Sequence, residues 1–211
     1  MQQERTAGME RGTAPRPGRP GRLGRSGHRK AERGVALVEA AIITPLLMML
    51  VFGIIEFGFA FKDSLTLANG SRAGARVGSA AGIDPVADWS ILQAVRGATG
   101  SLTKVDLIVV FKATGPTSSV PSSCVSTGGQ VGVCNVYNAA DMALSQASFL
   151  SAGYSKDDSW AAASRITSLT SANGPDYLGV YVRAQHNSIF QLIVPSRKLN
   201  DTVIMRLEPT R

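Results

Sequence analysis

The sequence has few of the residues on which enzyme and metal chemistry depends. Its 211 residues include two cysteines and two histidines, and aromatic residues make up 6% of the chain. It contains no nucleophile elbow, phosphate-binding loop, paired-histidine helix or cysteine cluster. One histidine, His186, lies outside the amino-terminal tail, and we assign it a structural role. The sequence therefore predicts a protein that is not an enzyme, with no cofactor, no metal site and no small-molecule substrate.

Positive charge is also scarce outside the amino-terminal tail. Residues 1–34 hold nine Lys and Arg against three Glu, whereas the rest of the chain holds thirteen against twelve Asp and Glu. A nucleic-acid-binding domain would instead spread its cations over a folded face, so we expect no nucleic-acid partner. The tail is rich in Pro, Gly and Arg and cannot bury a core. We expect 1–34 to be a disordered basic leader on the cytoplasmic side.

One long apolar run follows the tail. Residues 35–61 contain two charged side chains, Glu39 and Glu56, and the sixteen residues between them are uncharged. With its flanks the run is long enough to cross a bilayer, and the basic tail predicts a cytoplasmic amino terminus and an extracytoplasmic carboxyl-terminal domain. A removable secretory signal is the alternative, although its apolar region would be unusually long.

The two glutamates need an explanation, because a carboxylate in a membrane segment is costly and is usually functional. Glu39 lies one turn into the predicted helix, where interfacial water and the helix dipole would reduce that cost. Glu56 has two possible arrangements. It either lies at the outer interface and extends toward Lys62, or pairs with a basic residue of another subunit.

The surroundings of Glu39 resemble the processing site of type IV pilins and pseudopilins. Gly34 follows a basic cluster, Val35 comes next, and Glu39 is the fifth residue counted from Val35. The resemblance implies cleavage between Gly34 and Val35 by a prepilin peptidase. Glu39 would then be the charge partner of the new amino terminus and take part in helix packing.

The longer run "RGVALVEAAIITPLLMMLVFGIIEFGFAF", followed by "ANGSRAGARVGSAAG", resembles the amino-terminal region of the TadE-like family. One departure is Ala40, where the family commonly has an aromatic residue. The resemblance implies a minor pseudopilin of the bacterial cell membrane that supports assembly of a tight-adherence (Flp, type IV-like) pilus. Its partners would be membrane lipid, the prepilin peptidase and other pilin-like subunits.

Two other kinds of protein remain possible. Related TadG-like or TadF-like components share the amino-terminal pattern, although TadG-like proteins usually carry a larger outer domain. The chain could also be a signal-anchored extracytoplasmic binding protein or enzyme unrelated to pili.

Small residues dominate the segment 62–82, which we expect to extend the helix beyond the membrane. Glycines recur there every four residues, and this spacing places them on one helix face that another backbone can approach closely. We expect this face to pack against a domain or a neighbouring subunit; a glycine-broken connector is the alternative. The glycines are Gly70, Gly74, Gly78 and Gly82.

Residues 83–211 are expected to form an extracytoplasmic α+β domain. A helix is predicted near 84–100, strands near 103–114, 175–186 and 200–209, and short helices near 139–150 and 157–169. The result would be a pilin-like fold, with a long helix leading into a small antiparallel sheet with helical insertions.

Cys124 and Cys134 enclose a Gly- and Ser-rich loop. An extracytoplasmic location permits a disulfide between them, whereas zinc would need further ligands. Two free thiols are the alternative.

Overall fold

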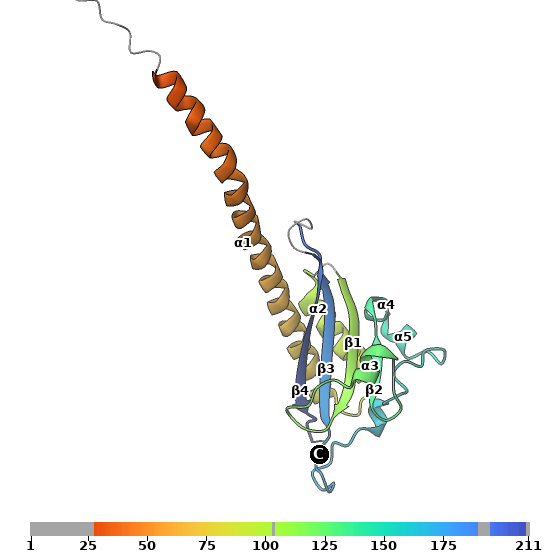
Figure 1. Cartoon of the computed structure of the whole chain (residues 1–211). Helices are drawn as coiled ribbons and strands as arrows, with labels where there is room; N and C mark the ends of the chain where they lie inside the picture. Colours follow the sequence, from red (N-terminus) through yellow and green to blue (C-terminus); the bar gives the residue numbers. More distant parts are fainter. Residues whose placement is uncertain (1–27, 103, 190–194, 210–211) are drawn as a thin grey trace, which may run out of the picture. The chain divides into compact units, whose positions relative to one another are not determined.

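The computed structural model describes residues 28–102, 104–189 and 195–209. The chain divides into two compact units, residues 1–46 and 47–211. Helix α1 (His28–Ala81) begins in the first unit and continues into the second (Figure 1). Residues 28–34 are therefore helical, although they were predicted to belong to a disordered leader; the rest of the predicted leader lies outside the described residues. Apolar helix formers follow Gly34 directly, so the helix continues backward through the charged residues that precede it.

The second unit is built on one antiparallel sheet. Its strands are β1 (Lys104–Ala113), β2 (Cys134–Tyr137), β3 (Tyr177–His186) and β4 (Arg197–Arg206), in the order β2-β1-β3-β4. With the long apolar helix, this sheet confirms the predicted α+β class.

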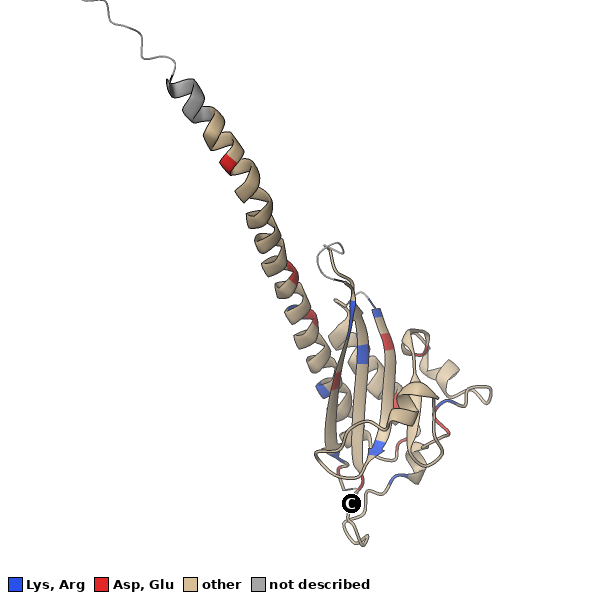
Figure 2. Ribbon diagram, viewed as in Figure 1, with Lys and Arg blue, Asp and Glu red and all other residues tan. Residues whose placement is uncertain are grey.

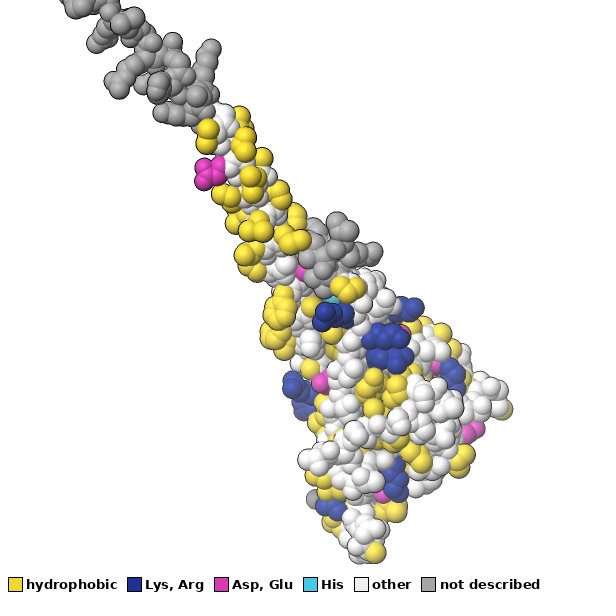
Figure 3. All heavy atoms as spheres, viewed as in Figure 1, with side chains coloured by type: hydrophobic (Ala, Val, Ile, Leu, Met, Phe, Trp, Pro, Cys, Tyr) yellow, Lys and Arg dark blue, Asp and Glu magenta, His cyan; other side chains and the backbone are white. Residues whose placement is uncertain are grey.

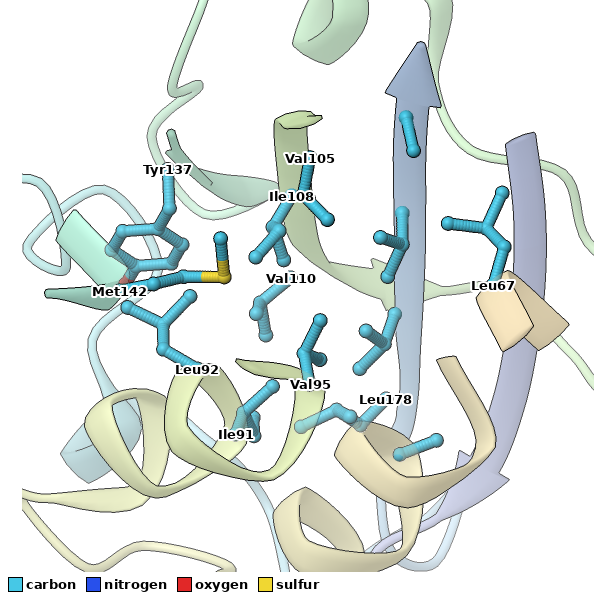
Figure 4. Close-up of a cluster of buried hydrophobic side chains, with 14 of the residues drawn as sticks. Leu67, Ile91, Leu92, Val95, Val105, Ile108, Val110, Tyr137, Met142 and Leu178 are labelled. Carbon is cyan, nitrogen blue, oxygen red and sulfur yellow. The ribbon is translucent and has the colours of Figure 1, made fainter. Parts of the chain in front are cut away.

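The larger core lies between one face of the sheet and two helices, α1 and α2 (Ala87–Thr99). Ile91, Leu92 and Val95 of α2 are fully buried and pack against Val110 and Leu178 of the sheet, among others (Figure 4). These residues are at positions i, i+1 and i+4 of the helix, which lie on one side of it, so α2 presents an apolar stripe to the sheet. The predicted second helix therefore exists, and its apolar residues are core.

A smaller core covers the opposite face of the sheet. Leu107, Val109 and Phe111 alternate with the residues of the first core along β1, as expected for a strand buried on both faces. The segment that packs on this face of the sheet includes helix α3 (Ser122–Ser126), which carries Cys124.

The segment between β2 and β3 is mostly irregular. Helices α4 (Ala139–Met142) and α5 (Gln146–Phe149) lie within the predicted stretch 139–150. The helix predicted over 157–169 is wrong, since a single short turn, η1 (Ala162–Ser164), forms there. Arg165 adopts an extended backbone that brings its side chain to Asp88, so a tertiary ion pair overrides the local helix preference.

Candidate functional site

The predicted processing residues lie on the first described turns of α1, within the first unit. Gly34, Val35 and Glu39 are all exposed, with 68% of Val35 accessible. Val35 and Glu39 are four positions apart in the helix, so their side chains share one helix face and lie about one turn apart. Both residues are thus on a surface that another molecule can reach.

The apolar surface of α1 continues over several turns beyond Glu39. The large side chains from Ile42 to Ile55 are mostly exposed, and Figure 3 shows this surface as hydrophobic. A free surface of this composition is unsuited to water, but it suits lipid or the helices of other membrane proteins. The helix is long and apolar enough to cross a membrane.

Glu56 is buried in the second unit, with 1% of its surface exposed. One carboxylate oxygen lies 3.0 Å from Nε2 of His186, and the other accepts a hydrogen bond of 3.1 Å from the backbone N–H of Ile189. The partner of Glu56 is therefore a histidine of the same chain. Neither Lys62 nor a second subunit is needed, which corrects both predicted arrangements.

His186 joins two carboxylates of α1. Its Nδ1 lies 2.7 Å from an oxygen of Asp63, two turns along the helix from Glu56. Burial lowers the pKa of His186, but the hydrogen bonds and negative charges of Asp63 and Glu56 outweigh it and raise the pKa above its ordinary value. A protonated imidazole donates to both carboxylates at once, so this cluster ties the end of β3 to α1.

The glycines of α1 pack against the domain to which the helix belongs. A Cβ added to Gly74 would lie 2.8 Å from Cγ2 of Val95, and one added to Gly78 would lie 2.7 Å from Cδ1 of Ile91. Gly70 faces Thr99 in the same way. These three glycines allow α1 and α2 to approach more closely than any larger residue would permit.

Gly82 has a different role from the other three. The helix ends at Ala81, one residue earlier than predicted, and Gly82 has φ +56°. A left-handed residue directly after a helix stops it, and glycine adopts this conformation without strain. Gly82 therefore terminates α1.

Cys124 and Cys134 form the predicted disulfide, and both are fully buried in the smaller core. The bond joins α3 to β2. It thereby fixes the loop between these elements to the edge strand of the sheet.

A buried polar cluster beside α2 is not predictable from sequence motifs. The carboxylate of Asp88 accepts hydrogen bonds from Tyr137 Oη at 2.6 Å and Asn135 Nδ2 at 2.7 Å, and it pairs with Arg165. Burial, followed by the charge of Asp88, raises the pKa of Tyr137 well above its ordinary value. Every oxygen of Asp88 is engaged, so the cluster is a structural junction between α2, β2 and the η1 segment.

No group of three or more His, Cys, Asp or Glu side chains suited to a metal ion occurs within the described residues. The fold and its contacts define a class of protein: a small α+β domain on one amino-terminal helix that can anchor it in a membrane.

Comparison with known families is more specific. A family model described as TadE-like protein matches residues 34–76, which include Gly34, Glu39 and Glu56, and confirms the resemblance noted in the sequence. The match ends before α2, so it covers most of α1 and leaves the sheet outside. No match was found among curated proteins or solved structures.

Proposed function

We propose that this protein is a non-catalytic minor pseudopilin that supports assembly of a tight-adherence pilus, and that a prepilin peptidase cleaves it between Gly34 and Val35. One observation carries the proposal: the TadE-like match begins at Gly34, and Glu39 lies one helical turn beyond Val35. The processing site and its charge partner thus coincide with the segment that resembles the family.

Cleavage would create an α-ammonium group at Val35 next to an apolar helix. Such a group is costly to bury alone, and a nearby carboxylate offsets much of that cost. The carboxylate of Glu39 is one turn away on the same face, and in a packed group of helices it would serve its own or a neighbouring amino terminus. Because Gly34 is helical, the peptidase must unwind this turn, and glycine weakens a helix by about 1 kcal/mol relative to alanine.

The exposed apolar surface of α1 would pack against lipid and other pilin-like subunits. The basic tail favours an amino terminus in the cytoplasm, with the domain outside. The buried disulfide supports this orientation, since such bonds persist in oxidising compartments.

The decisive experiment is amino-terminal sequencing and intact mass of the protein from membranes, with and without the prepilin peptidase. We expect a start at Val35 when the peptidase is present. Replacing Gly34 with Leu should block processing, whereas the matched change Gly58→Leu, at another glycine of α1 with open space around it, should not.

Two results would contradict the proposal. A start at Met1 in both samples would indicate an anchored binding protein or enzyme unrelated to pili. A start near Phe61 would indicate a domain released from a cleaved signal.

A further inference from the structure

Strand β4 runs beside α1 in the same direction. Near its middle, Asp201 accepts a hydrogen bond from Ser71 of the helix. At its end, the carbonyl of Arg206 accepts one of 2.6 Å from the hydroxyl of Ser79. Its first residue, Arg197, pairs in the sheet with His186, which contacts Glu56. The start of β4 is thus held at the level of Glu56.

The same level marks one end of the apolar span. Residues 35–55 rise about 32 Å as an α-helix, close to the ~30 Å thickness of the hydrocarbon core of a bilayer. When this segment spans a membrane, Glu56 and the start of β4 lie at the boundary with the headgroups.

Three exposed cations gather at this end of the sheet. Lys104 begins β1, and Arg197 and Lys198 begin β4; Gln185 of β3 pairs with both lysines. None of the three makes an ion pair with any described residue, in contrast to Arg183, whose Nε lies 3.1 Å from Asp106. Figure 2 shows basic positions at this end of the strands. The nearby carboxylates of Glu56 and Asp63 are already engaged by His186.

A groove of about 300 Å³ connects one of these cations, Arg197, to the apolar helix. It is lined by Gly53, Glu56, Phe57 and Ala60 of α1, by His186 of β3, and by Arg197 and Leu199 of β4. The groove thus runs from apolar residues of the membrane-spanning helix to the guanidinium of Arg197. A phospholipid would match it, with the acyl chain against the helix and the phosphate at the guanidinium. Arg binds phosphate through two parallel hydrogen bonds.

We propose that the start of β4 is a binding site for an anionic phospholipid of the adjacent leaflet, with the acyl chain in the groove, the phosphate at Arg197, and Lys104 and Lys198 facing neighbouring headgroups. The site requires that α1 spans the membrane. It does not depend on processing or on a pilus, so it can fail or succeed independently of the proposed function.

The test compares lysine reactivity in two lipid compositions. The full chain is placed in nanodiscs of phosphatidylcholine, or of phosphatidylcholine and phosphatidylglycerol in equal parts, and acetylation of each lysine by acetic anhydride is followed by mass spectrometry. An anionic surface stabilises the ammonium form of each nearby lysine. It thereby lowers the fraction of reactive neutral amine about fivefold. We expect Lys104 and Lys198 to react about fivefold more slowly in the anionic discs, and Lys112, at the far end of β1, to react equally in both.

Matched variants locate the site. Arg197→Gln should reduce the slowing at Lys198, whereas Arg72→Gln, which removes an exposed cation more than four turns beyond Glu56, should leave it unchanged. The proposal is overturned if Lys104 and Lys198 react equally in both compositions, or if Lys112 is slowed as much as they are. It is also overturned if inorganic phosphate added to phosphatidylcholine discs reproduces the slowing, because the site would then bind free anions.

Discussion

The carboxylate of Glu56 and the imidazole of His186, 130 residues apart in the chain, lie 3.0 Å from each other in a buried contact. The contact joins α1 to the last residue of β3. It also explains why a glutamate at position 56 is compatible with an otherwise apolar helix: its charge is satisfied by the domain of the same molecule.

Replacing His186 with Ala should destabilise the domain strongly. The change leaves Glu56 buried without its imidazole partner, and breaking a buried charge pair costs about 3 kcal/mol or more. Urea unfolding followed by the fluorescence of buried Trp160 would measure the loss. Asp63→Asn is the matched control with a smaller expected loss, since Asp63 is more exposed than Glu56. Equal stability of wild type and His186→Ala would refute this account of the contact.

Stability should also depend on pH through His186. Its pKa is raised in the folded protein, so its contribution is complete below the unfolded value of about 6.5 and declines as the pH rises through the folded value. The domain should thus become less stable from about pH 6.5 upward. Unfolding midpoints across that window would reveal the trend, and His186→Gln should flatten it. An identical slope in the variant would assign the effect to other groups.

The glycine surface of α1 predicts a sharp steric response. Gly74→Val would place side-chain atoms against Val95 and Ile91, and overpacking of this kind costs about 1–3 kcal/mol. Gly97→Ala is the control: Gly97 lies on the exposed side of α2 with nothing within 4 Å of the added Cβ, so this change should raise stability by up to about 1 kcal/mol. Thermal unfolding of both variants tests the prediction, which fails if Gly74→Val is as stable as wild type.

Removing the disulfide should weaken the smaller core. In the loop-entropy model, a bond that closes a loop of this size contributes about 3 kcal/mol. The double variant Cys124→Ser/Cys134→Ser should lose that amount in urea unfolding, and a reductant should lower the stability of the wild type but not of the variant. A reductant effect that persists in the variant would mean that the loss has another origin.

Glu39 should matter for assembly and little for folding of the domain. Glu39→Gln removes the carboxylate that would pair with an amino terminus at Val35, while the side chain remains nearly the same size. We expect normal cleavage and normal unfolding of the domain, but weaker association with other pilin-like subunits in membrane co-purification. The change Glu208→Gln, at an exposed carboxylate beyond the end of β4, is the control. Wild-type association of Glu39→Gln would exclude the charge-pairing role.

The sequence was most informative where one physical pattern dominated. The apolar run from Val35 to Phe61 predicted the helix. An apolar middle predicted the strand that is β1, and partial alternation predicted β3 and β4. The four-residue strand β2 was missed, because it is too short to show a pattern and owes its place to pairing with β1. The partner of Glu56 was missed because no local signal connects residues 56 and 186.

The packing of the glycines has a consequence for any assembly built from this helix. One flank of α1 from Gly70 to Gly78 is filled by the domain of the same molecule, while an apolar stripe of Ile54, Phe57, Phe61 and Leu65 remains exposed. A helix or lipid that contacts this part of α1 would therefore meet the apolar stripe, because the glycine flank is already occupied by the domain of the same molecule.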